Sequence, residues 1–142
     1  FFLIWGNRNF NEPLDGIVYG VFVSLGFAWA ENVIYVTHPI LCGYETALER
    51  ALLSVPGHGL FGVRMGYYFA LGKYRNRKRY LPLAFFSPYL AHALYNYFLL
   101  KREPVFWLFF SVLEVRLWGF GLKRIKELQN CSPFREKVSK ES

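Results

Sequence analysis

Three ionisable side chains, Glu31, His58 and His92, lie within long apolar stretches of this 142-residue chain. An ionisable group is costly in hydrocarbon, so each one within such a stretch is a candidate functional residue. A glutamate can polarise a water molecule as a general base, and histidines can donate hydrogen bonds to the oxyanion that forms when water attacks a carbonyl. These residue types therefore indicate hydrolytic chemistry.

Four apolar stretches make up most of the chain, at residues 13–36, 51–72, 80–100 and 104–122. Each approaches or exceeds the roughly 17–25 residues that a helix needs to cross a bilayer. Apolar residues form 54% of the sequence and gather in these blocks instead of following one helix face. The sequence therefore predicts an all-α, polytopic membrane bundle of about four transmembrane helices over residues 1–122, and it excludes a soluble domain.

The two ends of the chain differ from this pattern. Residues 1–5 are apolar but too short to cross a membrane, and the sequence does not begin with methionine. We interpret them as the end of a truncated preceding helix, so that the sequence is expected to be a fragment. Residues 123–142 are rich in Lys, Glu and Ser and are expected to form a solvated, mobile basic tail.

The basic residues gather at one end of the predicted bundle. Eight of them lie between the second and third stretches or directly after the fourth, namely Lys73, Arg75, Arg77, Lys78, Arg79, Lys123, Arg124 and Lys126. Loops rich in Lys and Arg stay in the cytoplasm, so this end is expected to be cytoplasmic in a bacterial-type plasma membrane. The net charge of +7 therefore indicates contact with the lipid bilayer and gives no support to nucleic-acid binding.

The three candidate residues are expected to lie at one depth. In this topology Glu31 lies five residues before the outer end of its stretch, and His58 and His92 lie seven and eight residues from the outer ends of theirs. At a rise of 1.5 Å per residue, all three come to lie roughly 8–12 Å below the outer surface.

Helix-face patterns direct the same residues toward the centre of the bundle. Small residues recur at every fourth position beside Glu31 and His58, and such stripes let helices pack closely. They are Gly16, Gly20, Ser24 and Ala28 in the first stretch and Gly62 and Gly66 in the second. Pro56 and Pro88 interrupt helix hydrogen bonding at a similar level, and the freed backbone groups need water or other partners. We therefore expect the three candidates to converge in one wet cavity.

Arg50 precedes His58 by eight residues and so lies on nearly the same helix face. It is expected to point toward the cavity from the rim, where it could pair with Glu31 or hold a substrate carbonyl. The other ionisable residues within the stretches are interpreted as structural. They are Asp15, Arg64, Glu114 and Arg116.

Several common hydrolytic mechanisms lack their motifs. The sequence has no His-Glu-x-x-His motif and no Gly-x-Ser-x-Gly motif. Asp15 is the only aspartate, which excludes an aspartyl dyad within this chain. Glu31, His58 and His92 also have the ligand types of a catalytic zinc site. Base-catalysed hydrolysis needs no metal, and no carboxylate is obvious that would accept a hydrogen bond from the outer nitrogen of a zinc-binding histidine, so we expect no cofactor and keep zinc as the alternative.

Several segments resemble the PrsW family of intramembrane proteases. They are EPLDGIVYG at residues 12–20, GFAWAENVIY at residues 26–35, Arg50 with Pro56, His58 and Gly66, and HALYN at residues 92–96. The resemblance covers about residues 12–96. Each motif is weak alone, but the combination is specific.

The resemblance implies a peptidase of the glutamate type, related to the CAAX prenyl endopeptidases, that cuts single-span membrane proteins such as anti-sigma factors. The matching polar positions are Glu31, His58 and His92 as candidate catalytic residues, with Asn32, Arg50 and Asn96 as supporting residues. The family also has a Glu-Glu-x-x-Lys motif on an earlier helix, usually assigned to water activation, and residues 1–11 do not match it. Either that helix precedes this sequence, as residues 1–5 favour, or the chain is a shortened homologue without full activity.

An alternative of a different class stays open. The chain could be a non-catalytic membrane scaffold or substrate-binding homologue, in which the Glu and His side chains only hold three helices together.

Overall fold

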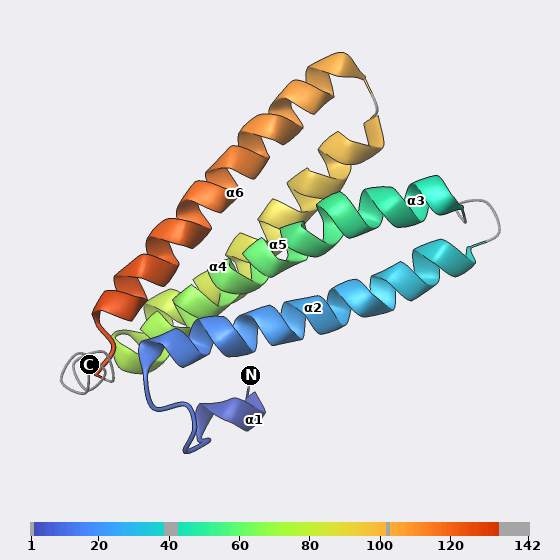
Figure 1. The fold of residues 1–142 in the computed structure, drawn as a ribbon. Coiled ribbons are helices and arrows are strands. Elements are labelled where there is room, and N and C mark those ends of the chain that lie inside the picture. The colour runs from blue at the N-terminus through green and yellow to red at the C-terminus, as the bar shows by residue number, and fades with distance from the viewer. Residues whose placement is uncertain (1, 39–42, 102, 134–142) are drawn as a thin grey trace, which may run out of the picture.

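The computed structural model describes residues 2–38, 43–101 and 103–133 of the chain, and its regular structure there is entirely helical. Four long helices form the bundle (Figure 1): α2 (Pro13–Thr37), α4 (Val55–Tyr74), α5 (Arg77–Lys101) and α6 (Pro104–Asn130). Two short helices, α1 (Phe2–Trp5) and α3 (Tyr44–Glu49), and one π-helical turn, η1 (Arg50–Ser54), complete it. The prediction of an all-α bundle of about four long helices is confirmed.

The outer surface of the bundle is apolar. By length and composition, α2 and α6 could each cross a membrane, and only 22% and 17% of the residues in their most apolar windows are buried. Side chains such as Phe22 and Trp29 on α2 are 71% and 72% exposed. Large exposed apolar surfaces of this kind suit contact with lipid. Together with the composition, they make the chain a helical membrane protein.

The central helix is α4, which packs against α2, α5 and α6. Glycines bring the backbones of α2 and α4 into direct contact. A Cβ atom built on Gly20 would lie 2.8 Å from the Cα of Gly66, and one built on Gly62 would lie 2.6 Å from the Cα of Val21. The predicted small-residue stripes are thus the packing surface between these two helices.

The second predicted helix begins earlier than residue 51. Helix α3, η1 and α4 follow one another without a break from Tyr44 to Tyr74. The π-helical turn η1 ends at Ser54, two residues before Pro56, whose ring nitrogen cannot donate a hydrogen bond. A widened turn of this type is frequent at functional sites in helices. Helix α3 was not predicted, because its polar residues separate it from the apolar stretches on which the prediction was based.

The fourth predicted helix ends later than residue 122. Helix α6 continues to Asn130, about two turns farther. Leu128 in this extension is buried, and Arg124 forms an ion pair with Glu127. The expectation of a mobile tail from residue 123 is therefore wrong for residues 123–130, because this segment has a packed apolar side. Residues 134–142 of the predicted tail lie outside the described residues.

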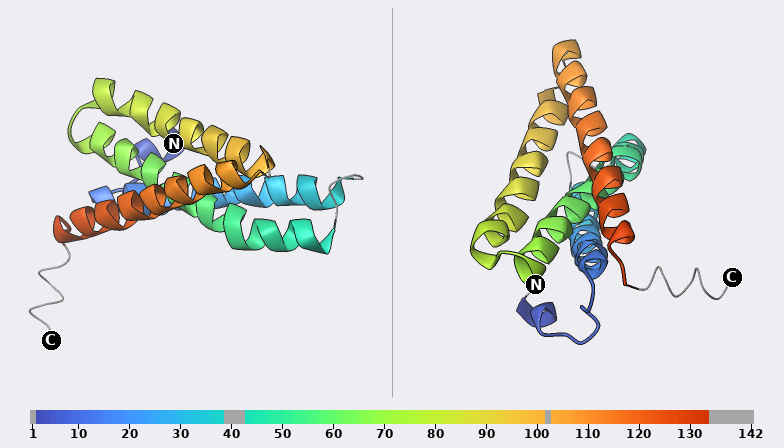
Figure 2. Two further views of the ribbon diagram at one scale, coloured as in Figure 1. Left: turned by 90° about the horizontal axis from the view of Figure 1, so that it is seen from above. Right: turned by 90° about the vertical axis from the view of Figure 1, so that its left-hand side faces the viewer.

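Two of the ionisable residues that were interpreted as structural, Asp15 and Arg64, make contacts within the bundle. Asp15 accepts hydrogen bonds from the backbone N–H groups of Asn11 and Glu12, which caps α2. Arg64 donates to the hydroxyl of Ser87 and stacks over the ring of Phe120. The α4–α5 connection and the end of α6 lie at the same end of the bundle (Figure 2).

Candidate active site

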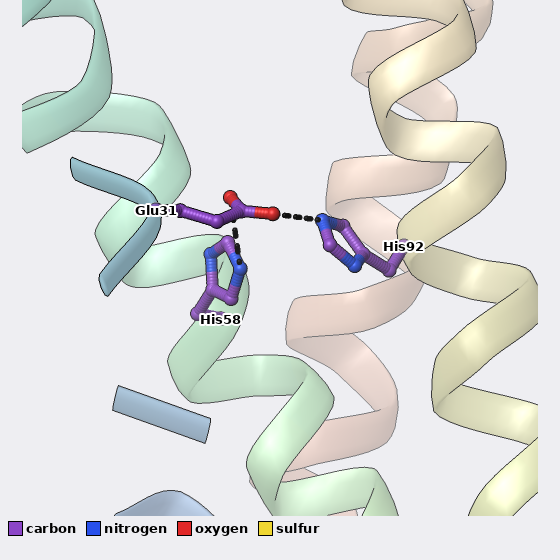
Figure 3. A group of neighbouring side chains, drawn as sticks. All are labelled: Glu31, His58 and His92. Atoms are coloured by element: carbon purple, nitrogen blue, oxygen red, sulfur yellow. Dashed lines mark ion pairs between the residues drawn. The ribbon is translucent and has the colours of Figure 1, made fainter. Parts of the chain in front are cut away.

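Three helices bring Glu31, His58 and His92 together (Figure 3). Glu31 comes from α2, His58 from α4 and His92 from α5. Their potential ligand atoms all lie within 4.8 Å of one another. The Nε2 atom of His58 is 3.5 Å from Glu31 Oε2, and the Nε2 atom of His92 is 3.6 Å from Glu31 Oε1. Residues that the sequence predicts at one depth thus meet as one cluster, named here the Glu31 cluster.

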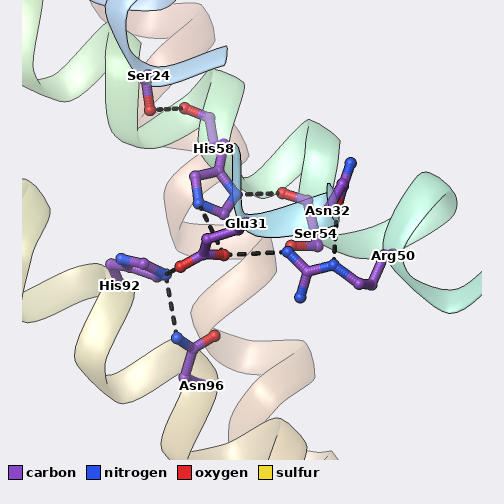
Figure 4. Close-up of polar contacts among 8 residues, drawn as sticks. All are labelled: Ser24, Glu31, Asn32, Arg50, Ser54, His58, His92 and Asn96. Carbon is purple, nitrogen blue, oxygen red and sulfur yellow. Dashed lines mark hydrogen bonds and ion pairs between the residues drawn. The ribbon is translucent and has the colours of Figure 1, made fainter. Parts of the chain in front are cut away.

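Backbone carbonyl contacts fix the position of His58 (Figure 4). Its Nδ1 lies 2.7 Å from the carbonyl oxygen of Ser54, which can only accept, so Nδ1 carries the proton. The hydroxyl of Ser24 on α2 donates to the carbonyl oxygen of His58 at 2.6 Å. The His58 side chain is 3% exposed, and its Nε2 faces Glu31. The ring is therefore held in one tautomer with its free nitrogen in the cluster.

Arg50 reaches the cluster from η1, as predicted. Its Nη2 donates to Glu31 Oε2 at 3.0 Å, and its Nε donates to the side-chain oxygen of Asn32 at 2.7 Å (Figure 4). The guanidinium also lies over the ring of Tyr35, 4.1 Å from its centroid. These contacts fix both the charge and the orientation of the Glu31 carboxylate.

Asn96 supports His92 one helical turn away on α5. Its side-chain N–H donates to His92 Nε2 at 3.0 Å, so this nitrogen carries a lone pair. Phe61 lies against both imidazole rings, with ring centroids 5.7 Å from His58 and 5.3 Å from His92. The two histidines thus have an apolar wall on one side and the carboxylate on the other.

The donor set fits a divalent metal ion. Two imidazole nitrogens and one carboxylate can hold zinc and leave a fourth position open. The Nε2 atom of His58 is buried and has no hydrogen-bond partner among the described residues. The Nδ1 contact of His58 with a carbonyl oxygen is the arrangement that metal-binding histidines usually have. Both Nε2 atoms face the carboxylate of Glu31, so two neutral imidazoles and this carboxylate could bind one cation between them.

Two cavities lie near the Glu31 cluster. The first, of about 330 Å³, lies beside Arg50 and Ser54 and is named here the polar pocket for the hydrogen-bonding side chains in its lining; its other lining residues are Tyr35, Thr46, Glu49, Leu99, Leu100 and Trp107. An apolar groove of about 260 Å³ exposes His58 and His92, and its other lining residues are Val23, Ser24, Phe27, Phe61, Met65, Phe85, Pro88 and Tyr89. The polar pocket offers hydrogen-bonding groups to water, while the lining of the groove is mostly apolar.

Sequence reasoning missed the roles of Ser24 and Ser54. Ser24 appears in the sequence only as a small residue of the packing stripe, although its hydroxyl bonds the backbone of His58. Ser54 acts through its carbonyl oxygen, which any residue type possesses. The four-residue spacing from Ser54 to His58 was the only available signal, and it is too common to be decisive.

A substitution of Arg50 tests the geometry around Glu31. We expect Arg50→Met to lower the free energy of unfolding by about 2–3 kcal/mol, because it removes hydrogen bonds between charged groups and leaves Glu31 without this partner. Arg8→Met, at an exposed position, is the matched control and should change little. Thermal unfolding in detergent measures both. Equal stability of the two variants would contradict the Arg50–Glu31 contact.

Comparison with known proteins gives a consistent family. The family described as "PrsW family intramembrane metalloprotease" matches residues 1–119. Protease PrsW of Geobacillus kaustophilus (strain HTA426) is 40% identical over 130 residues, which cover 89% of this chain and 56% of the relative. Protease PrsW of Oceanobacillus iheyensis is 42% identical over 127 residues, which cover 88% and 57%.

Protease PrsW of Bacillus subtilis (strain 168) is 37% identical over 133 residues, which cover 91% of this chain and 59% of the relative. The chain thus spans little more than half the length of these curated relatives. No solved structure gives a significant match. The family match covers most of the chain, including all three residues of the Glu31 cluster, and the chain belongs to the PrsW family.

Proposed function

We propose that the full-length protein is an intramembrane endopeptidase that hydrolyses its substrate at the Glu31 cluster. The observation that carries this proposal is the convergence of Glu31, His58 and His92 from three helices beside a polar pocket. The relatives are named as proteases, and the cluster has the residue types that such chemistry needs. Because the chain spans about half of these relatives, the activity is proposed for the whole protein.

We propose single-span membrane proteins, such as anti-sigma factors, as the substrates. The cluster lies away from the basic α4–α5 connection, which the positive-inside rule assigns to the cytoplasm. Cleavage is therefore proposed near the outer leaflet. An unwound peptide there could meet water that enters through the polar pocket.

The residues around the cluster have defined tasks in this proposal. Arg50 and Asn32 orient the Glu31 carboxylate, and the Ser54 carbonyl directs the free nitrogen of His58 toward it. Without a metal, Glu31 takes the proton from the attacking water, and a protonated histidine donates to the oxyanion. This is the cofactor-free mechanism that the sequence predicts.

The geometry adds a metal-bound form, which we favour. Glu31, His58 and His92 would hold a divalent ion such as zinc, in line with the family's description as metalloproteases. Zinc would polarise the substrate carbonyl and acidify water. Glu31 would then be a ligand, and another base must accept the proton. The resemblance assigns that task to the paired-glutamate motif, which residues 1–11 do not contain.

Metal analysis of the purified full-length protein distinguishes the two forms. We expect about one zinc ion per chain in the wild type, little in His92→Ala, and the wild-type amount in His38→Ala, because His38 lies outside the cluster. Chelation should also lower the unfolding temperature of the wild type. A folded, active, metal-free protein would contradict the metal-bound form and favour Glu31 as the base.

Cleavage itself is tested in membranes. The full-length protein is produced together with a single-span membrane protein that carries one tag at each end, and the tags are followed by immunoblotting. Separate tagged fragments support the peptidase. An uncut substrate beside a well-folded protein would instead favour the scaffold alternative, for which the polar contacts between α2, η1 and α4 offer a reason.

A further inference from the structure

A second apolar cavity lies between α4 and α5 at the basic end of the bundle. Its volume is about 370 Å³, which is within the range of small-molecule sites in proteins. One basic residue, Arg77, and six apolar residues line it, namely Trp5, Met65, Phe69, Leu81, Ala84 and Phe85. It is named here the Arg77 cavity.

The shape of the Arg77 cavity suits an elongated apolar group. Arg77 is the first residue of α5, and Leu81 and Ala84 follow on the same helix face. From Arg77 to Phe85 the lining spans eight residues of α5, about 12 Å. Ala84 is 6% exposed and Phe85 is 66% exposed, so the cavity has a buried wall and a side that opens on the apolar outer surface. A chain from the lipid phase could therefore lie in it along α5.

The charge at one end of the Arg77 cavity calls for an anion. No carboxylate forms an ion pair with Arg77 among the described residues, and its guanidinium lies 5.3 Å from the centroid of the Trp5 ring. Further basic residues lie beside it in the sequence, namely Lys73, Arg75, Lys78 and Arg79. Such a group of like charges attracts anions. An occupant that fits both ends has an apolar body and an anionic group next to Arg77.

We propose that the Arg77 cavity binds an anionic phospholipid of the membrane, with its phosphate at Arg77 and part of an acyl chain against Met65 and Phe85. Basic pockets between transmembrane helices are suited to anionic lipid headgroups. A zwitterionic phospholipid would fill the apolar part equally well, but its ammonium group offsets the phosphate charge, so the site should select the anionic lipid. Met65 and Phe85 also line the apolar groove, so the bound chain would border it. This inference does not depend on hydrolysis.

Photocrosslinking to lipid in vesicles tests the proposal. A photoreactive phenylalanine analogue replaces Phe85 in the full-length protein. Phe86 is the matched control position, because it is 63% exposed but does not line the cavity. The vesicles contain equal amounts of phosphatidylglycerol, which is anionic, and phosphatidylcholine, which is zwitterionic, with the same acyl chains. After irradiation, mass spectrometry gives the ratio of phosphatidylglycerol adducts to phosphatidylcholine adducts at each position.

Two arginine variants, each combined with the analogue at Phe85, test the position of the phosphate. Arg77→Gln removes the charge that lines the cavity, and Arg79→Gln removes the same charge two residues away, outside the lining. The two arginines are well matched, because both are exposed and each guanidinium lies near one aromatic ring, at 5.3 Å from Trp5 and 5.4 Å from Tyr80.

We expect the adduct ratio at Phe85 to be about fivefold higher than at Phe86, because one basic residue favours an anionic headgroup by about this factor. Arg77→Gln should lower it to the ratio at Phe86, whereas Arg79→Gln should change it less than about twofold, since charges beyond contact distance are screened. Equal ratios at Phe85 and Phe86, or an equal loss in both arginine variants, would overturn the proposal. A ratio that Arg77→Gln leaves unchanged, or adducts of the analogue at Phe85 with a protein segment in place of lipid, would overturn it as well.

Discussion

Replacement of Glu31, His58 or His92 by alanine in the full-length protein is expected to lower the cleavage rate of a single-span substrate by at least about 100-fold. Each change removes one member of a cluster whose potential ligand atoms lie within 4.8 Å of one another. Whether Glu31 acts as base or as metal ligand, no neighbouring side chain described by the structure reproduces its position between both imidazoles. The rate is followed by immunoblotting of the two tagged fragments.

Two control variants separate chemistry from helix packing. His38→Ala removes an exposed histidine at the end of α2 and should leave the rate within about twofold of wild type. Glu31→Gln keeps an oxygen that can accept from Arg50 and should preserve most of the stability while the rate falls as in Glu31→Ala. Wild-type cleavage by Glu31→Gln and both histidine variants would refute the assignment of the site.

The membrane fold could be predicted because the bilayer imposes a simple rule. Backbone polar groups must be satisfied within each spanning segment, so long apolar stretches read directly as helices. That rule gives no information outside hydrocarbon. It missed α3, whose residues Glu45 and Glu49 are polar, and it ended α6 at residue 122 although the helix continues to Asn130.

The candidate site could be predicted from the cost of charge in lipid. Glu31, His58 and His92 are conspicuous because ionisable residues are rare in such stretches, and equal depth suggested their convergence. The contacts that orient them were not predictable to the same degree. Ser54 acts through its backbone carbonyl oxygen, which every residue has, and the Ser24 hydroxyl donates to the backbone carbonyl oxygen of His58. Neither role can therefore be inferred from the residue type.

The second large effect is expected at the contact between α2 and α4. In Gly66→Ala, the new Cβ would overlap the carbonyl oxygen of Gly16 and lie 2.6 Å from the Cα of Ile17. These are backbone atoms that no side-chain rotation can move, so the two helices must separate. We expect a loss of about 3 kcal/mol in the free energy of unfolding, at the upper end of the usual cost of overpacking. Thermal unfolding in detergent measures it.

Gly59→Ala is the matched control, because it makes the same change on the same helix where nothing lies within 4 Å of the new Cβ. Alanine favours a helix over glycine by about 1 kcal/mol, so this variant should be as stable as wild type or slightly more stable. A lower free energy of unfolding in Gly66→Ala, together with an equal or higher one in Gly59→Ala, would therefore identify close packing. Equal unfolding temperatures of the two variants would contradict it.

The contact between α2 and α4 also sets the distance between Glu31 on α2 and His58 on α4, which is 3.5 Å between Oε2 and Nε2. Gly66→Ala protein that still folds should therefore bind less metal than Gly59→Ala, because separated helices can no longer hold both ligands around one ion.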